Sequence, residues 1–233
     1  MTAKLTRKQR ELALRQTLVF EAAEEVLGER GFHGASVDEI AKRAGLSVGT
    51  LYNLFGSKES LYAALMERGV EEIRAFVAAR VAGAPSGLAQ LHAAIDAIFA
   101  YFGEHERAFR VYVTATHGLD WNVLPQFGER VFRHMERFLD DITALCQRAV
   151  RERSLPRLDP ALLAMSLLGT INSFVTRWAT DRRDDLSGYR AGAHQILTAL
   201  AAGAAPSVAV PTRRVARVRR AATVPRKARH DSR

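Results

Sequence analysis

The chain has 233 residues, 48% of them apolar, which is enough to bury the core of one or two domains. Its single cysteine, Cys146, excludes an intramolecular disulfide and fits a reducing cytoplasm, and no apolar stretch is long enough for a membrane span or a signal peptide. The formal net charge is +9, but residues 206–233 carry +8 of it, so the rest of the chain is almost neutral.

The first predicted element is a helix over residues 6–30. Its apolar positions recur at helical spacing, which places one face against a core. The residues predicted on that face are Leu18, Val19, Ala22, Ala23 and Val26. Gly31 and Phe32 follow, and we expect the helix to end there because glycine readily leaves the helical conformation.

Two short helices are predicted next, over residues 36–44 and 47–55. Ser36 and Glu39 have the spacing of a capping box, in which each side chain binds the other residue's backbone N–H. Gly45 suits the left-handed conformation that reverses the chain after a helix. Ser47 is the predicted cap of the second short helix, whose inward residues are Val48, Leu51 and Phe55.

The outer face of the second short helix then carries Gly49, Thr50 and Asn53. A helix docked in this way can enter the major groove of DNA, where asparagine pairs with adenine and a threonine methyl contacts the methyl of thymine. Tyr52 and Lys58, near the cap Ser57, are placed to bind phosphates. A bare trihelical core is the alternative, but such a core does not require these residue types on one surface.

Six further helices are predicted, and no segment alternates as a strand would, so the fold class is all-α with about nine helices. The predicted ranges are 57–81, 88–102, 107–116, 126–153, 160–180 and 186–202. Asp159 and Pro160 mark the start of the fifth of these, as a cap followed by proline at the first helical position. Residues 206–233 lack large apolar side chains, so we expect a disordered Arg-rich tail.

The stretch VDEIAKRAGLSVGTLYNLFGSKESL, preceded by GERGFHGAS, resembles the DNA-binding head of the TetR (tetracycline-repressor) family of bacterial regulators. The resemblance covers about a quarter of the chain. It implies a helix-turn-helix domain over residues 1–56 and a helical ligand-binding and dimerisation domain over residues 57–205. The DNA-binding residues it implies are Ser36, Ser47, Gly49, Thr50, Tyr52, Asn53 and Lys58. Leu54 departs from the family, which often has a polar residue there.

The resemblance also implies a small apolar or amphipathic effector bound inside the bundle, and a homodimer. The predicted pocket residues are Phe99, Phe102, Phe109, Tyr112, Thr116, Trp121, Phe138, Phe174 and Trp178. The predicted dimer interface, on the helices at 160–180 and 186–202, comprises Leu167, Leu168, Ile171, Val175, Ile196 and Leu200. The alternatives are that the aromatic residues form ordinary core and that the chain is a monomer with the helix at 160–180 buried centrally.

The function predicted from these features is that of a sequence-specific transcriptional regulator. It would be a cytoplasmic, nucleoid-associated repressor that binds a pseudo-palindromic operator and is released by its effector. The scattered histidines and the single cysteine indicate no metal site or cofactor, and no catalytic motif is present, so an enzyme is not expected. A constitutive DNA-organising protein and a small-molecule carrier or enzyme remain the alternatives. The tail either contacts DNA or only improves solubility.

Overall fold

The computed structural model describes residues 6–106, 124–180 and 185–203, and every secondary-structure element in these ranges is an α-helix. The helices are α1 (Arg7–Gly34), α2 (Val37–Arg43), α3 (Val48–Phe55), α4 (Lys58–Val81), α5 (Gly87–Glu104), α7 (Leu124–Arg151), α8 (Pro160–Thr180) and α9 (Leu186–Ala202). The all-α prediction is therefore confirmed. The helix predicted at 107–116 and the tail at 206–233 lie outside the described residues.

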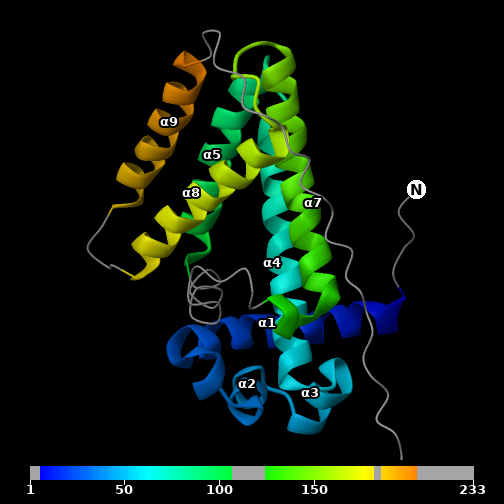
Figure 1. Ribbon diagram of the computed structural model, residues 1–233. Coiled ribbons are helices and arrows are strands. Elements are labelled where there is room, and N and C mark those ends of the chain that lie inside the picture. The colour runs from blue at the N-terminus through cyan, green and yellow to red at the C-terminus, as the bar shows by residue number, and fades with distance from the viewer. Residues whose placement is uncertain (1–5, 107–123, 181–184, 204–233) are drawn as a thin grey trace, which may run out of the picture.

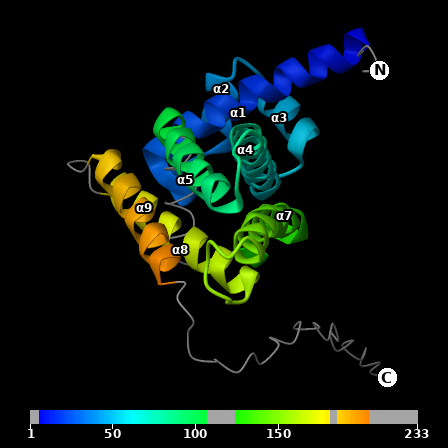
Figure 2. The ribbon, with the colours of Figure 1, turned by 90° about the horizontal axis from the view of Figure 1, so that it is seen from above.

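The helices form two layers (Figure 1). The head consists of α1, α2 and α3, and α4 rises from it beside α7 into the second layer. Seen from above, α8 and α9 lie side by side at one edge of the bundle (Figure 2). Within the bundle, α4 packs mainly against α5 and α7, and α7 also packs against α8.

Two separate clusters of buried apolar side chains correspond to these layers. The head cluster comprises Val19, Ala22, Ala23, Val26, Leu27, Ala35, Val37, Ile40, Ala41, Ala44, Leu51, Leu61, Tyr62, Leu65, Met66 and Val131. The bundle cluster is built from α4, α5, α7, α8 and α9, with Ile95, Phe99, Ile142 and Ile171 among its most buried residues. Among the described helices, only α4 and α7 contribute buried residues to both clusters, so these two helices join the layers.

The helical backbone of α1 is interrupted at Gly31, where the sequence predicts its end: Gly31 has a φ of 68°, and a further helical segment runs to Gly34 beyond this kink. Leu18 was predicted to face the core but is 38% exposed, whereas the adjacent Val19 is fully buried. Helical spacing alone could not show where along α1 the packing begins.

The predicted start of α8 is confirmed. Pro160 is the first residue of the helix, and the Asp159 carboxylate accepts a hydrogen bond from the Ala161 N–H at 2.8 Å. Proline suits this position because its missing N–H would have no partner inside the helix. The start of α8, and hence its register against α5 and α7, is therefore set by two adjacent residues.

The corner between α4 and α5 is closed against the end of α7 by Gly87. Its N–H donates to Glu152 Oε2 at 2.6 Å, and Arg148 donates to the Pro85 carbonyl at 2.9 Å. A Cβ atom at Gly87 would collide with the backbone of Ala149, lying 2.8 Å from its Cα. Only glycine therefore permits α5 to approach α7 this closely.

We predict that Gly87→Ala will lower the free energy of unfolding by about 1–3 kcal/mol, because the methyl group meets backbone that must move. Gly83→Ala is the matched control, since its added methyl group would meet no atom within 4 Å. Thermal and urea melts of both variants measure the difference. Equal stability of the two variants would show that the close approach is not a constraint on the fold.

Candidate nucleic-acid interface and ligand cavity

The position of α2 is fixed by its cap and by ion pairs to α1. Ser36 Oγ accepts the Glu39 N–H at 3.2 Å, as predicted. The second half of the predicted capping box is not formed, because the Glu39 carboxylate instead pairs with Arg30 at 2.9 Å. A complete capping box is present at the start of α1, between Thr6 and Gln9.

Arg43, at the end of α2, holds this helix onto α1. Its guanidinium donates to both carboxylate oxygens of Glu29, at 3.0 and 3.2 Å, and also lies 3.5 Å from Glu25. The hydrogen bond to Glu29 is the main cause that raises the pKa of Arg43. Because this arginine pairs with acidic side chains within the head, we do not include it among the residues that face DNA.

The turn between α2 and α3 has the conformation predicted for it. Gly45 has a φ of 67°, in the left-handed region, and the Leu46 N–H donates to the Ala41 carbonyl at 2.9 Å. This pattern ends α2 and sends the chain directly into the cap of α3. Leu46 is half-buried against the head cluster, so it anchors the turn.

In α3, burial on one face leaves a polar face exposed. Leu51 is buried in the head cluster, whereas Gly49, Tyr52 and Asn53 are exposed. Leu54, at the position where the family often has a polar residue, is half-buried against the same cluster and so contributes to packing. The exposed face therefore combines a glycine, an amide and a phenol on one short helix.

Serine caps begin both α3 and α4, and the first of them also restrains Thr50. Ser47 Oγ accepts the Thr50 N–H at 3.2 Å and lies 2.8 Å from Thr50 Oγ1. This second bond restrains the Thr50 side chain, whose methyl group can also contact a partner. Ser57 caps α4 and is followed by Lys58, which places a lysine at the start of that helix.

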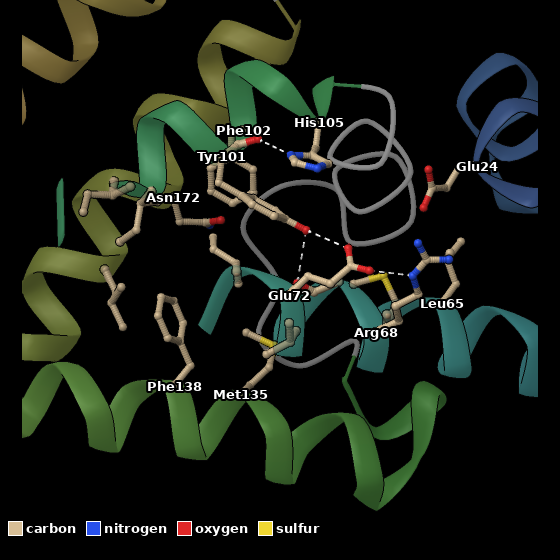
Figure 3. Close-up of a pocket in the computed structure, with 17 residues that line it drawn as sticks. Glu24, Leu65, Arg68, Glu72, Tyr101, Phe102, His105, Met135, Phe138 and Asn172 are labelled. Carbon is tan, nitrogen blue, oxygen red and sulfur yellow. Dashed lines mark hydrogen bonds and ion pairs between the residues drawn. The ribbon is translucent and has the colours of Figure 1, made fainter. Parts of the chain in front are cut away.

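A cavity of about 360 Å³ lies between the head and the bundle (Figure 3). Its wall comprises Glu24, Leu65, Met66, Arg68, Gly69, Val70, Glu72, Ile73, Ile98, Tyr101, Phe102, His105, Met135, Phe138, Leu168, Ile171 and Asn172. The wall thus includes α1 of the head as well as α4, α5, α7 and α8. This size falls within the range of small-molecule sites in proteins.

The charged groups of this wall gather at the end nearest α1 (Figure 3). Arg68 Nε donates to Glu72 Oε1 at 2.6 Å, and the Tyr101 hydroxyl lies 3.4 Å from both Glu72 Oε2 and the Gly69 carbonyl. Burial is the largest cause that raises the pKa values of Glu24 and Tyr101. The opposite end, around Phe138, is largely apolar, so the cavity suits an amphipathic molecule.

The predicted pocket residues fall into three groups. Phe102 and Phe138 line the cavity, whereas Phe99 is buried in the bundle cluster and does not line it. Phe174 and Trp178 are half-buried against the bundle cluster, also away from the cavity wall. The remaining four, Phe109, Tyr112, Thr116 and Trp121, lie outside the described residues.

Sequence reasoning missed the polar end of the cavity. Its residues come from three helices, α1, α4 and α5, that are dozens of positions apart in the sequence, so no local pattern connects the three helices. One signal was available: Arg68 and Glu72 are four residues apart and of opposite charge on a helix that is otherwise partly buried.

The predicted dimer residues divide between the interior and the surface of the protomer. Ile171 and Val175 are buried in the bundle cluster, and Leu167 and Leu168 are half-buried against it. Leu200 and Ile196, in contrast, are exposed, the latter by 42%. Ile171 and Val175, which were predicted at the dimer interface, are therefore packed inside the protomer, because α8 is apolar on more than one side and sequence alone did not show which side faces inward.

The surface of α8 has two further exposed apolar residues that the prediction did not include. These are Leu162 and Met165, which are 50% and 56% exposed. We group them with Ile196 and Leu200 on the adjacent helix α9 and call these four exposed residues the α8/α9 face. Exposed apolar residues on two adjacent helices are typical of surfaces that bind another protein.

The described residues contain no group of three or more His, Cys, Asp or Glu side chains that could hold a metal ion. Cys146 is buried, and burial raises the pKa of its thiol to about 11. The thiol is therefore protonated near neutral pH. In the described part of the chain, no helix has the length and apolar character needed to cross a membrane.

Residues 19–65 match the family model described as bacterial regulatory proteins of the tetR family. The chain is 37% identical over 90 residues to the transcriptional activator FasR of Mycolicibacterium smegmatis, an alignment that spans only 41% of FasR. It is 25% identical over 171 residues to the fatty acid metabolism regulator protein of Bacillus subtilis, covering 72% of this chain and 86% of that protein.

Among solved structures, the chain is similar to the transcriptional regulator FadR from Bacillus subtilis in complex with stearoyl-CoA. The TM-score is 0.69 and the identity is 22%, with 78% of this chain and 97% of that chain covered. This likeness extends over the head and the bundle, so the fold matches beyond the segment that the family model covers. The head of this chain therefore matches the tetR family model over residues 19–65, and the fold as a whole is similar to that of FadR.

Proposed function

We propose that this protein is a homodimeric repressor that binds a pseudo-palindromic operator and releases it when an amphipathic effector fills the cavity. The observation that carries the proposal is the exposed face of α3, where Gly49, Tyr52 and Asn53 are held outward by the burial of Leu51. The proposal places the protein in the cytoplasm and assigns it no catalytic step.

Each head would place α3 in the major groove. Asn53 can pair with an adenine edge, Gly49 allows the backbone to come close, and the methyl group of Thr50 can contact a thymine methyl. Tyr52 and Lys58 would bind phosphates, which position the head without reading sequence. Ser36 and Ser47 would act mainly through the helix starts that they cap, because their hydroxyl groups already accept backbone N–H groups.

The α8/α9 face is the surface that we propose for the dimer. Leu162 and Met165 on α8 and Ile196 and Leu200 on α9 expose apolar area on adjacent helices. A two-fold axis through such a face pairs it with its own copy. Two heads related by that axis require half-sites about 34–36 Å apart, or a multiple of that distance.

The effector that we propose is a molecule with an apolar chain and one polar end. The cavity offers apolar residues around Phe138 and hydrogen-bonding groups around Glu72 and Tyr101. The relationship to the Bacillus subtilis fatty acid metabolism regulator favours acyl compounds as the first class to test. An effector can shift DNA binding only if it binds the DNA-free arrangement more tightly than the DNA-bound one.

Selection of bound duplexes from a random-sequence DNA library tests the proposal directly. We expect an inverted repeat whose half-sites are one helical turn, or a multiple of it, apart. Titration of the selected duplex with acyl-CoA thioesters of increasing chain length then tests the effector class. Recovery of no preferred sequence, together with a steep dependence on salt, would instead indicate a protein that organises DNA without reading it.

We predict different losses for two variants of α3. Asn53→Ala should relax the preference at one base pair in each half-site by about 1–3 kcal/mol, because it removes a base contact. Tyr52→Phe should weaken binding to all sequences alike, because it removes a phosphate contact. Competition binding with single-base variants of the selected duplex separates the two effects. If Asn53→Ala keeps the wild-type preference at every position, α3 does not read bases through this residue.

We predict that Met165→Asp and Ile196→Asp will give folded monomers. Both side chains are exposed in the protomer, so a charge there opposes association without entering the core. Ile171→Asp is the contrasting variant, since a carboxylate buried without a partner should unfold the bundle. Sedimentation gives the oligomeric state, and circular dichroism gives the fold. Intact dimers of both surface variants would place the interface elsewhere.

A further inference from the structure

A continuous series of side-chain contacts leads from the cavity to the reading helix. It begins at Tyr101 of α5, whose hydroxyl lies 3.4 Å from Glu72 Oε2 and 3.4 Å from the Gly69 carbonyl (Figure 3). Glu72 in turn accepts a bond from Arg68 Nε at 2.6 Å. These contacts join α5 to α4 at the polar end of the cavity.

The series continues from Arg68 into the head. The central carbon of its guanidinium lies 5.2 Å from the centre of the Phe20 ring on α1, within the range of cation–π contacts. The Phe20 ring is tilted by 60° against the ring of Phe55, with 5.4 Å between their centres. Phe55 is the last residue of α3. Four contacts therefore join Tyr101 to the last residue of α3, and the last two of them lead from the cavity-lining Arg68 into the head.

The contacts in this series differ in strength. The Arg68–Glu72 bond is short and joins two opposite charges, whereas both bonds of the Tyr101 hydroxyl are long. The ring of Tyr101 is fixed, because it stacks on His105 at 4.2 Å and meets the edge of Phe76 at 5.6 Å. The hydroxyl of Tyr101 is thus the link that a bound molecule can most easily replace.

We propose that a hydrogen-bond donor at the effector's polar end replaces the Tyr101 hydroxyl at Glu72, and that Arg68, Phe20 and Phe55 carry this change to α3 within the same head. This inference rests on the proposed function, because it assigns the regulation of the same cavity. It differs from a change in the spacing between two heads, since it acts on the orientation of α3 in a single subunit. Tyr101, Arg68 and Phe20 are positioning residues that touch no DNA.

A double-mutant cycle tests this coupling without the effector, using the duplex selected by the wild-type protein. Tyr101→Phe should weaken binding about fivefold, the value of one ordinary hydrogen bond. Phe20→Leu should also weaken binding. The fold-loss of affinity in the double variant should be at least threefold smaller than the product of the two single fold-losses. Residues that act independently combine within about twofold.

Tyr189→Phe is the matched control, because Tyr189 is a half-buried tyrosine of α9 whose ring packs on Phe174, away from this series. The fold-loss of DNA affinity when Tyr189→Phe is combined with Phe20→Leu should equal the product of the two single fold-losses. Arg68→Lys provides a second test of the coupling. It keeps the charge but loses the planar group over Phe20, so it should also remove the effect of Tyr101→Phe on DNA affinity. This variant is informative even if Phe20→Leu does not fold.

Hydrogen exchange supplies a readout that a purely structural role of Tyr101 would not move. Amides of residues 48–55 should lose protection in Tyr101→Phe but keep it in Tyr189→Phe, at equal melting temperatures. If the affinity losses multiply when Tyr101→Phe is combined with Phe20→Leu and with Arg68→Lys, and if α3 keeps its protection, the proposed coupling is wrong. That result would leave the regulator function intact, whereas failure of the wild-type protein to select any duplex would overturn the function itself.

Discussion

The structure depends on α4 as a single uninterrupted helix shared by two cores. Its first turns place Leu61, Tyr62, Leu65 and Met66 in the head cluster, and its later turns place Ile73 and Val77 in the bundle cluster. A helix of this kind is rigid along its axis as long as its backbone hydrogen bonds are intact. The orientation of the head therefore follows from the packing of the upper half of α4.

Polar contacts along α4 and α7 supplement this packing. Arg74 Nε donates to Asp141 Oδ2 at 2.7 Å, and Arg130 lies 2.9 Å from Glu67. Exposed ion pairs such as these contribute little to stability, about 0–1 kcal/mol each. The apolar residues of α4 and the burial of Val131 from α7 in the head cluster contribute more, because each removes apolar area from water. The ion pairs then favour one register of the two helices.

The sequence predicted the head well and the bundle only in outline. The turn at Gly45 and the serine caps of α2, α3 and α4 are encoded by neighbouring residues, so they could be derived locally. The burial of Ile171 depends on which side of α8 meets α5 and α7, and α8 is apolar on several sides. The cavity could not be derived, because its polar residues meet only after α1, α4 and α5 are packed together.

The cavity lies where the head cluster meets the bundle cluster. Its wall contains Leu65 and Met66, which belong to the head cluster, and Ile73 and Ile98, which belong to the bundle cluster. A molecule bound there touches both cores at once and lies against the middle of α4. Under the proposed function, occupancy of the cavity would therefore be connected to the orientation of the head through α4.

The most direct test of this central claim is the affinity of two Gly69 variants for the selected duplex. Gly69 lies in α4 between its head residues and its bundle residues, and a methyl group added there would meet no atom within 4 Å. Gly69→Ala should bind as tightly as the wild type, whereas Gly69→Pro should kink α4 and lose most specific binding while remaining helical and dimeric. Undiminished binding by a folded, dimeric Gly69→Pro protein would contradict the claim that α4 sets the orientation of the head.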